Sequence, residues 1–117
     1  KYSAVTLGLL HGARPQGMIL CYEAGRKHVS FMPHVPLTPL GRLVEVYEQV
    51  ANLVSPGLVI GIAANTRRFD DDEAERECAR VERELGLPTC DVIRHGPTRL
   101  LDAILARREA LLSMVSA

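Results

Sequence analysis

The chain has 117 residues, enough for one compact domain and too few for two. Its 14 basic and 14 acidic side chains balance, which excludes the strong positive charge expected of a protein that binds nucleic acid or an anionic membrane. Apolar residues make up 47% of the chain and aromatic residues only 4%, so a core can form but base-stacking surfaces have little material. No run of about 18 apolar residues is present, and a membrane-spanning helix is therefore not expected.

The first half of the chain predicts a helix, a strand and a long irregular segment. An apolar helix is expected from Ser3 to His11, ending at Gly12 in the left-handed conformation. Residues 17–22 form an unbroken apolar run, which is typical of a parallel strand buried on both faces. The segment 23–39 contains three prolines and is expected to be irregular, and connections of this length are often functional.

The second half predicts helices and strands in alternation. Thr38 is expected to cap a helix with one continuous apolar stripe, and residues 58–64 form a second buried strand. Asp70 begins the next helix with a capping-box pattern. A third, shorter strand is expected at 88–93, and a last helix follows Pro97.

This order predicts an α/β fold with a parallel sheet of about three strands flanked by helices. So narrow a sheet is expected to leave one long edge exposed. The chain begins almost at once with an apolar helix, which needs more neighbours than a chain of this length supplies. We therefore expect the chain to be the C-terminal part of a longer protein, with a processed or tagged start as the alternative.

The three cysteines predict no disulfide framework and no zinc site. Cys21, Cys78 and Cys90 form no CxxC pair; Cys21 falls in a strand-like run and Cys78 on the apolar stripe of a predicted helix. We expect Cys21 and Cys78 to be small buried side chains of a cytoplasmic protein, with a catalytic thiol at Cys21 or Cys90 as the alternative. His28 and His34 lie six positions apart without a neighbouring cysteine or carboxylate pair, so no metal is expected on this chain.

Ligands of an open parallel sheet bind beyond the carboxyl ends of its strands. That rule selects residues 22–28, 65–68 and 94–98 as the walls of a small-molecule site. Cationic side chains give these segments a local positive bias that suits an anionic ligand, with a solvated surface as the alternative. They are Arg26, Lys27, Arg67, Arg68 and Arg94.

Asn65 ends the second strand, where its amide can both donate to and accept from the edge of a purine. Several P-loop enzymes of the dethiobiotin-synthetase kind place an asparagine there to recognise a base; a turn-forming asparagine is the alternative. His95 precedes a helix N-terminus that suits a carboxylate or phosphate, and it is either a base or an ordinary loop residue. His11 is either a partner of the helix dipole or a site residue that faces a neighbouring loop.

Several short segments, spread in order along the chain, match the motifs of a known family. They are Tyr2 to Gly12 (YSAVTLGLLHG), Met18 to Glu23 (MILCYE), His28, Pro33-His34, Pro36-Leu37, Val59 to Ile62, Asn65-Thr66 and Glu84 to Pro88 (ELGLP). Together they resemble the DgcN-type D-glutamate N-acetyltransferase family, long known only as a domain of unknown function. The ordered series covers essentially the whole chain and is more specific than any one of its pieces.

The resemblance implies a Rossmann-like N-terminal domain followed by a domain of P-loop nucleoside-triphosphatase type. Residues 1–117 would be the last part of that three-layer P-loop domain. Family members transfer an acetyl group from acetyl-CoA to the amine of D-glutamate or a related D-amino acid, and ATP or GTP is a further candidate ligand. Without the N-terminal domain and the phosphate loop, the chain is expected to be inactive alone. Its expected partners are the missing part of the same protein and further copies in a homo-oligomer.

Transfer of an acetyl group needs a neutral amine, an oriented thioester and a donor to the developing oxyanion. From the positions that match the family's motifs, we expect His11 or His28 to be the catalytic base. The residues expected to bind substrate or nucleotide are Gly12, His34, Asn65, Thr66, Arg67 and His95.

Two other functions remain open. The first is a nucleotide-binding, kinase-like P-loop domain in which Asn65 reads the base. The second is a non-catalytic oligomerisation module whose apolar first and last helices pack against another subunit. The chain contains no GxxxxGK[ST] phosphate loop, no GxGxxG after a strand and no GxSxG elbow, so it is not expected to hydrolyse nucleotides by itself.

Overall fold

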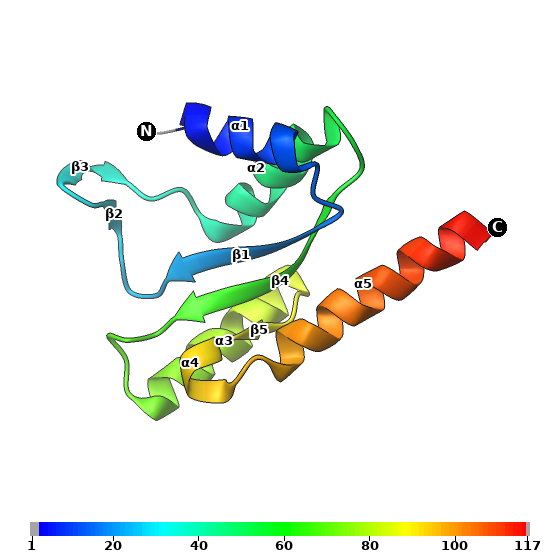
Figure 1. Cartoon of the computed structure of the whole chain (residues 1–117). Helices are drawn as coiled ribbons and strands as arrows, with labels where there is room; N and C mark the ends of the chain where they lie inside the picture. Colours follow the sequence, from blue (N-terminus) through cyan, green and yellow to red (C-terminus); the bar gives the residue numbers. More distant parts are fainter. Residues whose placement is uncertain (1–2, 117) are drawn as a thin grey trace.

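A parallel three-stranded sheet forms the centre of the structure, a computed structural model that describes residues 3–116 (Figure 1). The strands are β1 (Gly17–Glu23), β4 (Leu58–Asn65) and β5 (Thr89–Cys90), in the order β1-β4-β5. Both pairs of neighbouring strands are parallel, which confirms the predicted α/β fold. Tyr2 of the sequence motif lies outside the described residues.

Helices cover both faces of this sheet. The core lies on the face covered by α2 (Leu40–Asn52) and α3 (Asp71–Leu85), where buried side chains of β1, β4 and α3 meet. On the other face, α5 (Thr98–Ser116) lies against β4, because Gly61 has no side chain in the way of Leu100. The buried side chains of the core are Leu20, Val59, Ile62 and Val81.

The first helix, α1 (Ser3–Ala13), packs against α2. The prediction that Gly12 ends this helix in the left-handed conformation is wrong, because the helix continues through Gly12 to Ala13. Arg14 instead has a positive φ of 51°, and its N–H donates to the carbonyl oxygen of Leu10. Pro15 explains the position of the break, since a residue before proline is disfavoured in the helical conformation.

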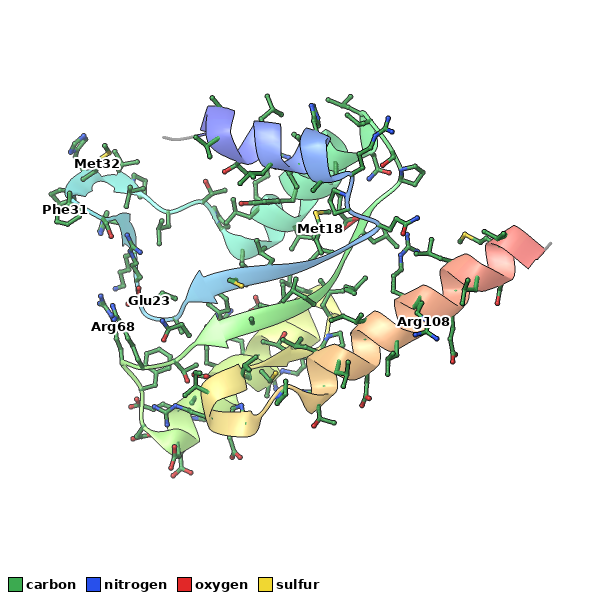
Figure 2. The ribbon with its side chains drawn as sticks, in the orientation of Figure 1. Met18, Glu23, Phe31, Met32, Arg68 and Arg108 are labelled. Carbon is green, nitrogen blue, oxygen red and sulfur yellow. The ribbon has the colours of Figure 1, made fainter. Side chains whose placement is uncertain are left out.

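The segment predicted to be irregular contains a small antiparallel hairpin, β2 (His28–Val29) with β3 (Met32–Pro36). Phe31 turns the hairpin with a φ of 62° and lies fully exposed at its tip, next to Met32 (Figure 2). This strand was not predicted because β3 contains two prolines, Pro33 and Pro36. Proline removes a backbone donor, but a two-stranded ribbon tolerates it on an outer edge.

The expected helix caps have different outcomes. Thr38 does not cap α2, because Pro39 occupies the capping position and no side-chain hydrogen bond is made there. Asp70 does cap α3: it accepts the N–H of Glu73 at 2.8 Å, and Glu73 accepts the N–H of Asp70 at 3.2 Å. The third strand is shorter than predicted, because Asp91 caps the four-residue helix α4 (Val92–His95) and ends the extended backbone at Cys90.

The outer surface of the described part of the chain has an unpaired strand edge and a projecting helix. Within residues 3–116, β1 pairs with β4 on one side only, so its other edge carries no strand. The outer half of α5 extends away from the sheet (Figure 1), and apolar side chains of α1 and α5 are exposed. None of the helices described is both long enough and apolar enough to cross a membrane.

Candidate functional site

A cavity of about 730 Å³ opens at the carboxyl ends of the three parallel strands. Ligands bind at this edge in open parallel sheets. The walls come from the end of β1, the end of β4 and the start of α4. The lining residues are Cys21, Tyr22, Glu23, Ala63, Ala64, Asn65, Arg67, Asp91, Val92, Ile93 and Arg94.

Thr66 and Asp91 form a buried hydrogen-bonded pair at the carboxyl edge of the sheet, and Asp91 also lines the cavity. Asp91 Oδ2 accepts the backbone N–H of Thr66 at 2.9 Å and also the Thr66 hydroxyl. Asp91 Oδ1 accepts the N–H of Ile93 at 3.0 Å and that of Arg94 at 3.4 Å. Burial alone would raise the pKa of Asp91, but the hydrogen bonds from Thr66 and from the start of α4 hold this pKa below its usual value. Asp91 is therefore a fixed anion that joins β4 to α4.

Arg94 ties the same region to the loop after β4. Its Nη2 donates to the carbonyl oxygen of Thr66 at 3.2 Å and to that of Phe69, and its Nη1 contacts Asp71. Its Nε lies 3.8 Å from Asp91 Oδ2. With these partners, Arg94 holds the loop in place rather than presenting a free charge to the cavity.

Glu23 gathers three arginines at the mouth of the cavity. Arg67 donates to Glu23 Oε1 from Nη2 at 3.0 Å and Nε at 3.2 Å, and Arg68 donates to the same oxygen from Nε at 2.9 Å. Arg26 lies farther away, with Nη1 3.7 Å from Oε2. The hydrogen bond from Arg67, with that from Arg68, lowers the pKa of Glu23. Figure 2 shows Glu23 at the end of β1, beside Arg68.

Asn65 lines the cavity at the last position of β4. Its Oδ1 accepts the backbone N–H of Arg67 at 3.2 Å, in the manner of an Asx turn. The carbonyl end of the amide is therefore engaged within the loop. The NH₂ end is the part of Asn65 suited to donate to a ligand.

The four candidate histidines lie in different places. His95 is next to the cavity wall, where its Nδ1 accepts the N–H of Asp91 at 3.2 Å, so in its neutral form the proton lies on Nε2. His28 and His34 are exposed on the hairpin that follows β1. His11, with Gly12, is on α1 and leads into the amino end of β1; its Nε2 donates to the carbonyl oxygen of Val50 at 2.9 Å. The structure does not bring His11 and Asn65 to a common cavity.

The buried thiols do not suit a nucleophile, and the described part of the chain shows no metal centre. Burial raises the pKa of the Cys78 and Cys90 thiols, so both stay protonated at neutral pH. Cys21 is exposed and lines the cavity, so the prediction that it is buried is wrong. It lies near the end of edge strand β1, beyond the cover of α5. Among residues 3–116, no group of three or more His, Cys, Asp or Glu side chains could hold a metal ion.

The sequence placed Glu23 in a predicted wall segment, residues 22–28, but gave it no role, and it did not select Asp91. Glu23 follows an apolar strand in the sequence, but its partners Arg67 and Arg68 are 44 and 45 positions away. Asp91 falls inside an apolar run that reads as a strand. The signal that could have found Asp91 is its place between a buried Cys90 and a short segment able to form a capped helical turn.

Comparisons with known proteins give consistent matches. Residues 1–101 match the family model described as "Domain of unknown function (DUF1611_C) P-loop domain". A D-glutamate N-acetyltransferase from Tritonibacter scottomollicae is 37% identical over 107 residues, which cover 91% of this chain and 32% of that protein. One from a Pseudoalteromonas species is 29% identical over 106 residues, covering 90% and 31%. The chain thus spans about a third of the length of these curated relatives.

A solved structure shares the fold. It is the crystal structure of a DUF1611 family protein from Anabaena variabilis, with a TM-score of 0.82 and 38% sequence identity. The match covers 86% of this chain and 30% of that one.

Proposed function

This chain belongs to the DUF1611 family, as part of its C-terminal P-loop domain, and we propose that it supplies one wall of an N-acetyltransferase active site. The full-length protein would transfer an acetyl group from acetyl-CoA to the amine of D-glutamate or a related D-amino acid. Two relatives that carry the name D-glutamate N-acetyltransferase support this proposal. The chain alone would be inactive, because it spans only about a third of those relatives.

The observation that carries the proposal is the cavity at the carboxyl ends of the strands. It has a volume of about 730 Å³, within the usual range for small-molecule sites, and arginine and asparagine side chains line it. Arginine binds carboxylates through two parallel N–H donors, so Arg67 suits the carboxylate of an amino-acid substrate. The free NH₂ of Asn65 suits a carbonyl oxygen of the substrate or of the thioester.

Acetyl transfer to an amine requires the protein to orient the two substrates, to accept a proton and to stabilise the oxyanion. The substrate ammonium must lose a proton before its nitrogen attacks the thioester carbonyl, and the oxygen of that carbonyl then becomes negative. Collapse of this intermediate breaks the C–S bond, the nitrogen loses a second proton, and CoA leaves as its thiol. We assign removal of the first proton to His28, which lies on the exposed hairpin after β1 and outside the cavity walls, rather than to His11, whose imidazole donates to the carbonyl oxygen of Val50. Asn65 would donate to the developing oxyanion.

The test uses the full-length protein with acetyl-CoA and D-glutamate, and measures release of the CoA thiol. We expect Asn65→Ala to lower kcat/KM about 100-fold, the loss typical of an oxyanion donor. His28→Ala should lower kcat, whereas His11→Ala should act only through stability. Arg76→Ala is the matched control, because Arg76 is exposed on α3 away from the cavity walls. Parental turnover in both Asn65→Ala and His28→Ala would contradict the assignment.

A nucleotide site is the second candidate, because the matching family is described as a P-loop domain. The residues present here fit such a ligand only in part. Asn65 could read a base, but the chain contains no GxxxxGK[ST] loop to hold the phosphates. Calorimetry of the full-length protein with ATP and with GTP would test this candidate. Binding that Asn65→Ala weakens would favour it over a role of Asn65 in acetyl transfer.

A further inference from the structure

The cluster of Glu23 with Arg26, Arg67 and Arg68 has more positive than negative charge. Three guanidinium groups against one carboxylate leave a surplus of two positive charges. The chain as a whole has a formal charge of zero, so this surplus is local to the cavity mouth. Glu23 Oε1 accepts all three hydrogen bonds from Arg67 and Arg68, whereas Oε2 has the 3.7 Å contact with Arg26. The local field therefore favours a second anion.

The backbone that carries Arg67 and Arg68 is fixed. Thr66, immediately before them, is fully buried and bonded to Asp91 through its N–H and its hydroxyl. Phe69, immediately after them, donates its N–H to the carbonyl oxygen of Thr66 at 2.9 Å. The two arginines are thus held at the cavity mouth by a preorganised turn, which lowers the entropic cost of binding a ligand there.

The ion pairs themselves are easy to exchange. The side chains of Arg67 and Arg68 are 67% and 53% exposed, although that of Glu23 is only 15% exposed, and ion pairs whose cation is open to solvent contribute modest net stability. Glu23 also lines a second cavity of about 580 Å³, on whose walls Arg26 and Lys27 lie. A Glu23 carboxylate displaced from Arg67 and Arg68 therefore has other cations within its surroundings.

We infer that Arg67 and Arg68 bind a carboxylate of a small acid in the position that Glu23 occupies in this structure, and that Glu23 competes with the acid for them. A carboxylate is the anion that these two side chains already hold. The inference rests on the proposed function only for the identity of the acid, which would be D-glutamate.

The test is calorimetric titration of the full-length protein with glutarate, which has two carboxylates and no amine and so needs no acetyl transfer. Glu23→Gln removes the competing charge and keeps the shape, so we expect it to bind glutarate about threefold more tightly. The double variant Arg67→Ala/Arg68→Ala should bind glutarate at least about tenfold more weakly. Arg76→Ala should bind like the parent, and thermal unfolding checks that each variant is folded.

Glu23→Gln is expected to tighten glutarate binding and the double variant to weaken it, so Glu23→Gln still tests the competition if the double variant fails to fold. A Glu23 with a purely structural role predicts equal or weaker binding of glutarate by Glu23→Gln, and that result would overturn the inference. A comparison of acetyl-CoA with its 3′-dephospho form tests a phosphate instead. If the double variant weakens only the phosphate-bearing compound and not glutarate, the carboxylate assignment is wrong. Glutarate binding with the expected signs but no acetylation of D-glutamate would refute the proposed function alone.

Discussion

At the scale of single residues, one carboxylate joins the parts of the candidate site. The Asp91 side chain is buried and accepts hydrogen bonds from Thr66 at the end of β4 and from the start of α4. These donors are fixed in the fold, and they stabilise the ionised form of the carboxylate. The stability of the protein is therefore linked to the ionisation of Asp91.

This linkage predicts a particular pH dependence. Because the folded state lowers the pKa of Asp91, its contribution is complete above the ordinary pKa of an aspartate and is lost as the pH falls through the lowered value. We expect Asp91→Asn to reduce the free energy of unfolding at neutral pH by about 1–3 kcal/mol. The variant should also lose less stability than the parent on acidification. Denaturant titrations from neutral to acidic pH measure both effects, and parallel pH profiles would contradict the linkage.

Residues whose partners are close in sequence could be predicted, and those with distant partners could not. Asp70 is recognisable as a cap because Glu73 stands three positions later, and the structure has both bonds. The bond between Asp91 and Thr66 could not be predicted, because Thr66 lies 25 positions away, although Asp91 also has partners close in sequence at the start of α4. Glu23 falls in a predicted wall segment, but its pairing with Arg67 and Arg68 was not predicted for the same reason: the arginines come from the loop after another strand.

At the scale of elements, the turn before β4 lies tightly against the segment before β1. Gly57 is buried there, and a Cβ on it would lie 2.3 Å from the carbonyl oxygen of Pro15. The Asn52 side chain holds the same turn, since its Nδ2 donates to the carbonyl oxygen of Gly57 at 2.8 Å. The close approach of two backbones fixes where β4 enters the sheet beside β1.

A pair of glycine substitutions tests this contact. We expect Gly57→Ala to destabilise the protein by about 1–3 kcal/mol, because a backbone atom must move to accept the new methyl group. Gly8→Ala is the counterpart: its Cβ would meet nothing within 4 Å, and alanine favours a helix over glycine by about 0.5–1 kcal/mol. Thermal unfolding should therefore shift in opposite directions. Equal stability of the Gly57→Ala variant and the parent would refute the close contact.

Elements with a strong local pattern were predicted, and two without one were not. The apolar runs of β1 and β4 and the striped helix α2 are evident in the sequence. The hairpin of β2 and β3 was missed because its strands are short and contain prolines. Helix α4 was missed because its first two residues, Val92 and Ile93, are β-branched and fall in the strand predicted at 88–93.

At the scale of the whole molecule, α5 makes the protein elongated. The radius of gyration is 15.3 Å, whereas a compact chain of this length is expected to have about 13 Å. Ile104 and Leu105 on this helix are 46% and 42% exposed, and Leu9 on α1 is 68% exposed. Exposed apolar side chains gathered on projecting elements indicate contact with further protein.

We therefore expect the chain to associate with itself when it is produced alone. Sedimentation velocity should show a species heavier than the 12.9 kDa of one chain, with a fraction that rises with concentration. Ile104→Glu/Leu105→Glu should shift the equilibrium towards the monomer. Arg108→Ala, an exposed substitution on the same helix, should leave it unchanged. A monomer at every concentration would contradict the expectation.

The outer edge of β1, unpaired in the part of the chain that the structure describes, should be detectable by hydrogen exchange of its backbone amides. Along residues 17–23, alternate backbone amides have no neighbouring strand among residues 3–116 to bond them. In the chain alone, these amides should exchange with deuterium faster than the amides bonded within the sheet. Slower exchange at the same amides in the full-length protein would identify β1 as the place where the rest of the polypeptide extends the sheet.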